Sequence, residues 1–192
     1  MSTGWILLII IVGAVLFAIT IYNRLVAGRN RYKNAFAQID VQLTRRHDLI
    51  PNLVETAKGY IKHERETLEA VINARNVAVS GLKAAAADPT DPEAIRRLSE
   101  AEQGLSGALG RLFALSEAYP DLKANTNFQH LADRISQLEN TIADRREYYN
   151  ESVNINNVRI EQFPDVIVAN KFNFKAFAIW IRTKTLLVEI SL

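Results

Sequence analysis

The sequence predicts an all-α protein in which a single N-terminal transmembrane helix precedes an antiparallel helical bundle with one very long helix. Three patterns lead to this prediction: an uncharged apolar run near the N-terminus, an apolar stripe with a seven-residue repeat, and proline- or asparagine-marked starts of two later helices. The predicted units are a membrane anchor over 1–23, a helical bundle over 24–163 and an apolar, basic tail over 164–192.

The composition is that of a folded protein, with 48% hydrophobic and 23% charged residues. Its 23 Lys and Arg residues against 21 Asp and Glu residues give a net charge of +2, which is too small to indicate a nucleic-acid partner. Because the chain has no cysteine, disulfides, thiolate nucleophiles and cysteine-based zinc sites are excluded.

The segment from Trp5 to Tyr22 is the predicted span. It has 18 residues without a charge, is rich in Ile, Leu and Val, and has an aromatic residue at each end. A cleaved signal peptide is the competing interpretation, but residues 1–4 lack the positive charge that such peptides carry. Four basic residues follow, expected to fix topology and to contact lipid headgroups: Arg24, Arg29, Arg31 and Lys33. Their position predicts an external N-terminus and a cytoplasmic bundle.

A long apolar stripe continues beyond the span, interrupted by Arg46 and Glu64. Its main row contains Phe36, Leu43, Ile50, Ala57, Val71 and Ala78, flanked by Ile39, Leu53, Tyr60 and Ala74 and by Val54, Ile61, Leu68 and Leu82. Neither Gly28 nor Gly59 alone forces a break. We therefore expect one helix over 24–86, which at 1.5 Å per residue would be roughly 95 Å long.

Pro51 lies inside this helix, where a proline removes a backbone hydrogen bond and costs about 3 kcal/mol. Because Ile50 and Leu53 keep the phase of the stripe across it, we predict a kink in a helix that continues in register. The alternative is a helix that ends near Leu49 and restarts at Pro51, with Asp48 as its cap.

Two further helices are expected. The first runs from Pro92, with Asp91 as its N-cap, to a point before Pro120. Within it, small residues are expected to let two helix backbones pack closely: Gly104, Gly107 and Ala108. The second follows a cap at one of the residues 125–127 and carries a single apolar face as far as Tyr149. The fourth member of the bundle is then one half of the long helix, divided at Pro51, or a helix of another subunit.

The tail mixes basic and apolar residues without a dominant helical or strand period. Its candidate contact residues are Phe172, Phe174 and Trp180, among the basic residues Lys171, Lys175, Arg182 and Lys184. Two interpretations stay open: a segment on the membrane surface, and a segment packed against the protein's own bundle.

Several long blocks of this sequence resemble the LemA family of bacterial membrane proteins. They are "YNRLVAGRNRYKNAFAQIDVQLTRRHDLIPNLVETAKGY", "LSGALGRLFALSEAYPDLKANTNFQHL" and "LENTIADRREYYNESVNINN", followed by the "FP" of Phe163 and Pro164. The resemblance implies one span in the bacterial inner membrane, a short outer N-terminus and a cytoplasmic bundle. It implies no established enzymatic activity, and it points to membrane organisation, including magnetosome membranes, and to neighbouring membrane proteases. The last 28 residues are expected to depart from the family pattern: Ala169, Phe172 and Phe174 match an A-x-x-F-x-F-like stretch of the family, but the ending "KAFAIWIRTKTLLVEISL" looks unlike the usual one.

The residues carry no recognisable catalytic or metal-binding pattern. The three histidines, His47, His63 and His130, form neither an H-E-x-x-H motif nor the Glu-x-x-His spacing of helical di-metal sites. We therefore expect no catalytic residues, no cofactor and no metal.

The function expected from these patterns is a membrane-anchored, self-associating scaffold that organises or shapes the membrane or its proteins. Its partners would be the lipid bilayer and further copies of the chain, as a homo-oligomer. The stripe residues expected to form the seam of the bundle or of the oligomer are Phe36, Ile39, Leu43, Ile50 and Leu53. The alternative is an adaptor that presents its bundle to another membrane protein, such as a protease.

Overall fold

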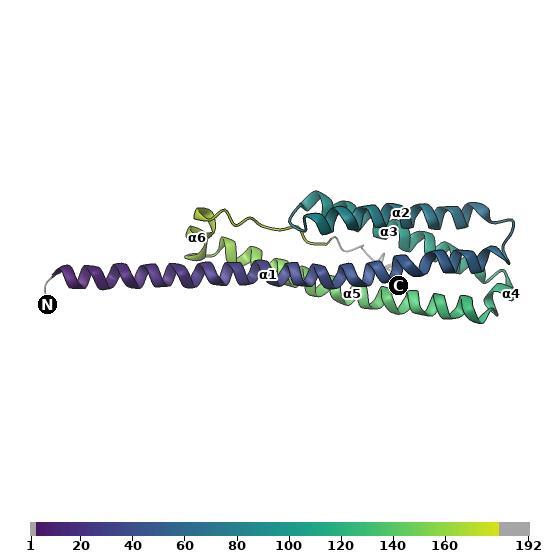
Figure 1. Cartoon of the computed structure of the whole chain (residues 1–192), viewed down its shortest axis with the longest axis horizontal. Coiled ribbons are helices and arrows are strands. Elements are labelled where there is room, and N and C mark those ends of the chain that lie inside the picture. Colours follow the sequence, from purple (N-terminus) through teal and green to yellow (C-terminus); the bar gives the residue numbers. More distant parts are fainter. Residues whose placement is uncertain (1–2, 181–192) are drawn as a thin grey trace, which may run out of the picture.

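The computed structural model describes residues 3–180, and all regular structure in that range is helical. The helices are α1 (Thr3–Lys58), α2 (Arg65–Ala87), α3 (Pro92–Ser116), α4 (Pro120–Lys123), α5 (Thr126–Glu161) and α6 (Asp165–Lys171). Figure 1 shows α1, α2, α3 and α5 side by side as an antiparallel bundle, with the N-terminal part of α1 projecting beyond it. The predicted fold class is confirmed: an apolar N-terminal helix leads into a helical bundle.

Helix α1 is continuous across Pro51 and also across the predicted boundary between anchor and bundle at residue 23. Ile50 and Leu53 are both fully buried on the side that faces the other helices. The prediction of a helix that continues in register is therefore confirmed, and the alternative of a restart at Pro51 is wrong.

The prediction of one very long helix over 24–86 is wrong, because α1 ends at Lys58 and the chain reverses before α2 begins at Arg65. The amides of Tyr60 and Ile61 both bond to the carbonyl of Ala57, which closes the last turn of α1. The side chain of Ile61 turns into the core, where it is 1% exposed. Burying the second half of the stripe against α3 outweighs the modest helical preference of residues 59–64.

The starts of α3 and α5 agree with the sequence prediction. The Asp91 side chain accepts a hydrogen bond from the amide of Glu93 at 2.9 Å, and Pro92 occupies the first turn of α3. Asn125 is the cap of α5, since its side chain accepts from the amide of Phe128 at 2.9 Å. Helix α2, and not a half of α1 divided at Pro51, is the remaining member of the bundle.

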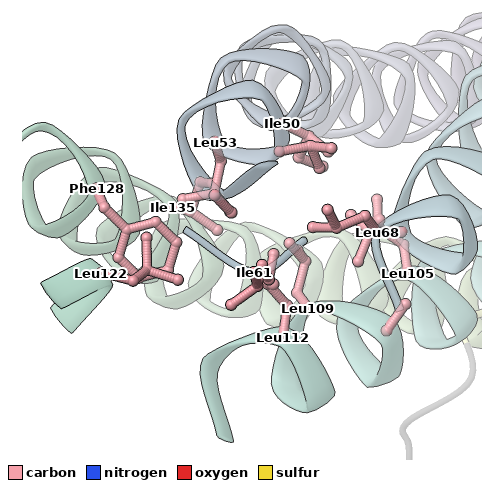
Figure 2. Packing of buried hydrophobic residues seen from close by; sticks show 14 of the residues in the cluster. Ile50, Leu53, Ile61, Leu68, Leu105, Leu109, Leu112, Leu122, Phe128 and Ile135 are labelled. Atoms are coloured by element: carbon pink, nitrogen blue, oxygen red, sulfur yellow. The ribbon is translucent and has the colours of Figure 1, made fainter. Parts of the chain in front are cut away.

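The core consists of three apolar clusters along the length of the molecule. We call the end with the α1–α2 loop the distal end and the opposite end the anchor end. Figure 2 shows the distal cluster, to which α1, the α1–α2 loop, α2, α3, α4 and α5 all contribute. The labelled residues are Ile50, Leu53, Ile61, Leu68, Leu105, Leu109, Leu112, Leu122, Phe128 and Ile135. Because α1 to α5 and the α1–α2 loop all contribute side chains, the distal end is held together by apolar burial.

Candidate functional site

The first turns of α1 form an apolar surface that the rest of the described chain leaves uncovered. The side chains from Trp5 to Ile19 are exposed, and this helix is long and apolar enough to cross a membrane. The basic residues Arg24, Arg29, Arg31 and Lys33 are exposed just beyond it. The guanidinium carbon of Arg29 lies 5.6 Å from the ring centroid of Phe174, so this cation also packs on the tail.

Helix α6 packs beside α1 at the point where the apolar segment joins the bundle (Figure 1). Val168 and Ala169 are buried together with Ile21 and Leu25 of α1. The outward side of this region carries three exposed apolar residues, which we call the anchor-end patch: Phe163, Ile167 and Phe172. Phe163 is 81% exposed. The patch is therefore placed to meet the bilayer surface next to the span.

The tail runs back along the bundle from α6. Of its predicted contact residues, Phe172 is exposed and its ring meets Tyr22 edge-on at 4.8 Å, while Phe174 is half-buried against the same ring. Trp180 is only 2% exposed and belongs to the middle core cluster. Of the two interpretations of the tail, packing against the protein's own bundle therefore applies to residues 174–180, which we call the tail segment. Arg182 and Lys184 lie outside the described residues.

The predicted seam residues lie inside the protein's own bundle. Phe36, Ile39, Leu43, Ile50 and Leu53 are at most 3% exposed. They pack against side chains of α2, α3 and α5 in the distal and middle clusters. They form a bundle seam, and they are not accessible to a neighbouring chain while the bundle is folded.

The predicted close packing at Gly104 and Gly107 is wrong within this chain. Both glycines are exposed, and a Cβ atom built on either would meet no heavy atom of the described residues within 4 Å. Ala108 is buried, but through ordinary side-chain packing in the distal cluster. The close approach of α2 to α3 occurs instead at Gly81, where a Cβ would lie 3.3 Å from the Cα of Leu98.

A buried polar cluster lies between the distal and middle apolar clusters. It consists of Arg46 and His47 from α1, Glu102 and Ser106 from α3, and Glu139 from α5. Arg46 is 1% exposed and forms ion pairs with both Glu102 and Glu139. Glu102 also bonds to Nε2 of His47 at 2.9 Å, and the Ser106 hydroxyl donates to Glu139 at 3.0 Å. Both carboxylates pair with the one buried guanidinium, and these ion pairs connect α1 with α3 and α5.

Helix α2 is connected to this cluster by a hydrogen bond from one of its side chains to the backbone of α1. Nε of Arg75 donates to the backbone carbonyl oxygen of His47 at 3.1 Å. All four long helices are thus connected at one level of the bundle.

A pocket of about 410 Å³ opens beside the polar cluster, and Arg46, Glu102, Glu139, Arg146 and Trp180 contribute to its lining. The Arg146 guanidinium lies 6.0 Å from the ring centroid of Trp180. Burial lowers the pKa of Arg146, while the nearby charge of Glu139 acts in the opposite direction. The tail segment therefore covers a charged interior layer of the bundle.

A larger pocket, of about 800 Å³, lies at the distal end between α1 and α2. Its lining includes both acidic and basic side chains and the apolar residues Pro51, Val54, Ile61, Leu68 and Ile72. Pro51 is exposed on this surface. Apolar and charged side chains therefore both face this pocket.

A model of the LemA family matches residues 35–185. The chain belongs to the LemA family. The match includes most of the tail, so the expectation that the last 28 residues depart from the LemA pattern is wrong as far as residue 185.

Three relatives illustrate the similarity. The chain is 27% identical over 187 residues to magnetosome protein MamQ of Magnetospirillum gryphiswaldense, covering 88% of this chain and 69% of that protein. It is 24% identical over 158 residues to magnetosome protein MamQ 1 of Paramagnetospirillum magneticum, covering 74% of this chain and 58% of that protein. It is 28% identical over 158 residues to protein LemA of Metamycoplasma hominis, covering 82% of this chain and 68% of that protein.

Sequence reasoning missed the polar cluster of this LemA protein. In the sequence Arg46 only interrupts the apolar stripe, and Glu102 and Glu139 carry no pattern of their own. A charged residue at an apolar position of a heptad is the one signal that could have located the cluster. Among residues 3–180 the LemA chain brings together no group of three or more His, Asp or Glu side chains that could hold a metal ion.

Proposed function

We propose that this protein is a membrane-anchored scaffold that self-associates in the bacterial inner membrane and there organises or shapes the membrane or its proteins. In this proposal the bundle lies in the cytoplasm, and the protein carries out no catalytic chemistry. The observation that carries the proposal is the continuity of α1, which joins the apolar segment and the bundle in one helix. Contacts between neighbouring spans are then transmitted directly to the bundles.

The comparisons support the membrane setting of this proposal. Two of the relatives are named as magnetosome proteins. The apolar helix of this chain, which is long enough to cross a membrane, agrees with a membrane setting. The orientation rests on the exposed basic residues that follow the span, such as Arg24 and Lys33.

Self-association requires a surface other than the buried seam. The apolar segment offers one, because Ala14 and Ala18 lie one turn apart on its exposed surface and small residues let spans pack closely. Gly13 is equally open, since a Cβ built there would meet no heavy atom within 4 Å. We place the contact between copies along this face of the span.

An adaptor that presents its bundle to another membrane protein is the second candidate. The observation that favours it is the distal pocket of about 800 Å³, whose apolar lining residues would suit an apolar segment of a partner. In this case the chain would act as a monomer.

Disulfide cross-linking of full-length protein in liposomes separates the two candidates. The chain has no cysteine, so an Ala18→Cys variant carries a single thiol. A Leu16→Cys variant is the matched control, because residue 16 lies on the opposite side of the helix. We expect rapid cross-linking of Ala18→Cys and little of Leu16→Cys at the same protein density. Equal cross-linking of both variants, together with a monomeric wild-type protein at every density, would replace the scaffold by the adaptor.

A periplasm-dependent reporter fused after Leu192 tests the orientation separately. It should be silent if the bundle is cytoplasmic. Strong reporter activity would reverse the assignment.

A further inference from the structure

Two asparagines of α5 hold the backbone of the tail segment. The Asn157 side chain accepts from the amide of Phe177 and donates to its carbonyl, both at 2.9 Å. The Asn150 side chain bonds to Trp180 in the same way: it accepts from the backbone amide of Trp180 at 2.7 Å and donates to the Trp180 carbonyl at 3.1 Å. Each amide group therefore satisfies both polar backbone groups of one tail residue, as a neighbouring β-strand would.

The spacing of the two asparagines matches an extended peptide. Seven residues of α-helix cover about 10.5 Å, and three steps of an extended chain cover about 10 Å. Asn157 pairs with Phe177 and Asn150 with Trp180, so the tail segment runs antiparallel to α5. The Tyr149 hydroxyl adds a third backbone contact by donating to the carbonyl of Ala178 at 3.1 Å.

Side-chain selectivity comes from the first and last paired positions. The ring of Phe177 lies 4.1 Å from that of Tyr32, centroid to centroid. Trp180 is buried beside Arg146 over the polar cluster. Ile179, between them, is exposed. Ala178 packs against the middle cluster, so the surface selects an aromatic residue, a small residue, one unrestricted residue and then a tryptophan, in extended conformation.

We propose that this surface, defined by Tyr32, Arg146, Tyr149, Asn150 and Asn157, is a peptide-binding groove whose partner is the tail segment of a second copy of this chain. The occupant seen in the structure shows which chemistry fits. Lys175 and Ala176 are exposed and lie between Phe174, which packs on Tyr22, and Phe177, the first paired residue, so a change of backbone direction at these two residues can redirect residues 177–180 while Phe174 keeps its contacts. Exchange of residues 177–180 preserves every contact that they make in the groove, so the concentration of copies in the membrane decides its extent. This proposal rests on the proposed self-association and names a second contact for it.

A peptide-binding measurement tests recognition by the groove. The receptor is the full-length chain in lipid with its own tail weakened by Phe177→Ala and Trp180→Ala, and the probe is a labelled peptide of residues 173–180. Fluorescence anisotropy should show saturable binding. Affinity should fall at least tenfold when Asn150→Ala and Asn157→Ala are added to the receptor. It should fall as much when the peptide itself carries Phe177→Ala and Trp180→Ala. Circular dichroism confirms that each receptor is folded. Absent binding, or binding unaffected by the asparagine changes, would overturn the proposal.

A complementation experiment tests exchange between copies. One full-length partner keeps its tail but has Asn150→Ala and Asn157→Ala, and the other keeps its groove but has Phe177→Ala and Trp180→Ala. Labels are attached through Val77→Cys, an exposed position on α2. Energy transfer in liposomes should be higher in the mixture than in either variant alone. If the mixture shows no gain while wild-type copies still associate, the groove proposal fails and the scaffold stands. Monomeric wild-type protein would instead contradict the scaffold, and peptide binding would still report on the groove.

Discussion

The side chain of Arg75 donates a hydrogen bond to the backbone carbonyl oxygen of His47, the carbonyl that Pro51 leaves without its helical partner. In an α-helix the amide of residue 51 would bond to the carbonyl of residue 47, but proline has no amide hydrogen. His47 is buried, so an unpaired carbonyl there would cost about 1–3 kcal/mol. Arg75 of α2 therefore stabilises the interior proline of α1 from outside the helix.

This relationship predicts strong coupling between residues 51 and 75. Arg75→Ala should lower the free energy of unfolding by about 1–2 kcal/mol in the wild-type background. It should cost much less in a Pro51→Ala background, because the restored amide can bond to the His47 carbonyl. Urea unfolding of the four proteins of this cycle in detergent gives the coupling energy. Additive effects would show that Arg75 acts independently of the proline.

The buried polar cluster predicts a large effect of a small substitution. Glu102→Gln removes the charge shared by Arg46 and His47 and should destabilise the bundle by about 3–5 kcal/mol. The control is Glu100→Gln, two residues away on the same helix, whose pair with Arg96 is exposed and should contribute under about 1 kcal/mol. Thermal unfolding compares them. Similar losses for the two variants would contradict a special role for the cluster.

The glycines of the bundle should respond in opposite ways to a methyl group. Gly104→Ala should raise the free energy of unfolding by roughly 0.5–1 kcal/mol, because the site is open and alanine favours helix. Gly81→Ala should forfeit this gain or reverse it, because its Cβ would press on the α3 backbone at Leu98. Denaturant titration of the two variants measures the difference. A loss of stability at Gly104→Ala would reveal a helix of another chain packed there.

Two buried tyrosines predict a loss of stability in alkali. Burial raises the pKa of Tyr32 from its ordinary value of 10.0 to about 12, and burial raises the pKa of Tyr149 as well. A folded pKa above the unfolded value means that stability is complete below pH 10 and is lost as the pH rises toward 12. Unfolding followed from pH 8 to 12 should show this decline, and Tyr32→Phe should reduce it.

The same two tyrosines differ at neutral pH. The Tyr32 hydroxyl is buried and has no hydrogen-bond partner among residues 3–180, so Tyr32→Phe should raise the free energy of unfolding by about 1 kcal/mol. Tyr149→Phe should lower it by a similar amount, because it removes the bond to the Ala178 carbonyl. The reverse order of stability would indicate that the Tyr32 hydroxyl is paired in solution.

The anchor-end patch should contact lipid. In liposomes, a fluorescent label attached at Phe163→Cys should be quenched by lipid-bound quenchers, since Phe163 is 81% exposed and directly precedes the turn into α6, which packs against Ile21 and Leu25 at the end of the span. A label at Val77→Cys, exposed on α2 within the bundle, is the control and should stay unquenched. Equal protection of both labels would place the patch away from the bilayer.

Local sequence signals were sufficient where the cause of a structure is local. Asp91 with Pro92 marks the start of α3, and Asn125 the start of α5, because capping involves only neighbouring backbone amides. The passage of α1 through Pro51 could be predicted from phase, since Ile50 and Leu53 report on the same buried face.

The features that could not be predicted depend on contacts between distant residues. The reversal after Lys58 replaces a helix that local preferences allow, and what favours it is packing of α2 on α3, as at Gly81 and Leu98. The partners of Arg46 lie 56 and 93 positions further along the chain, at Glu102 and Glu139. The asparagines that bind the tail read as ordinary surface residues until the tail is placed beside them.

The uninterrupted α1 also sets the distance at which this protein can act. From Asn23 to Lys58 the helix rises about 54 Å at 1.5 Å per residue, so the α1–α2 loop stands that far along α1 from the end of the span. No hinge interrupts this length, and a rotation of the span about its own axis must therefore turn the distal pocket by the same angle. Tilt or rotation of the helix in the bilayer would therefore change the position and orientation of a partner bound at the distal end, because the bundle transmits the motion as one rigid body.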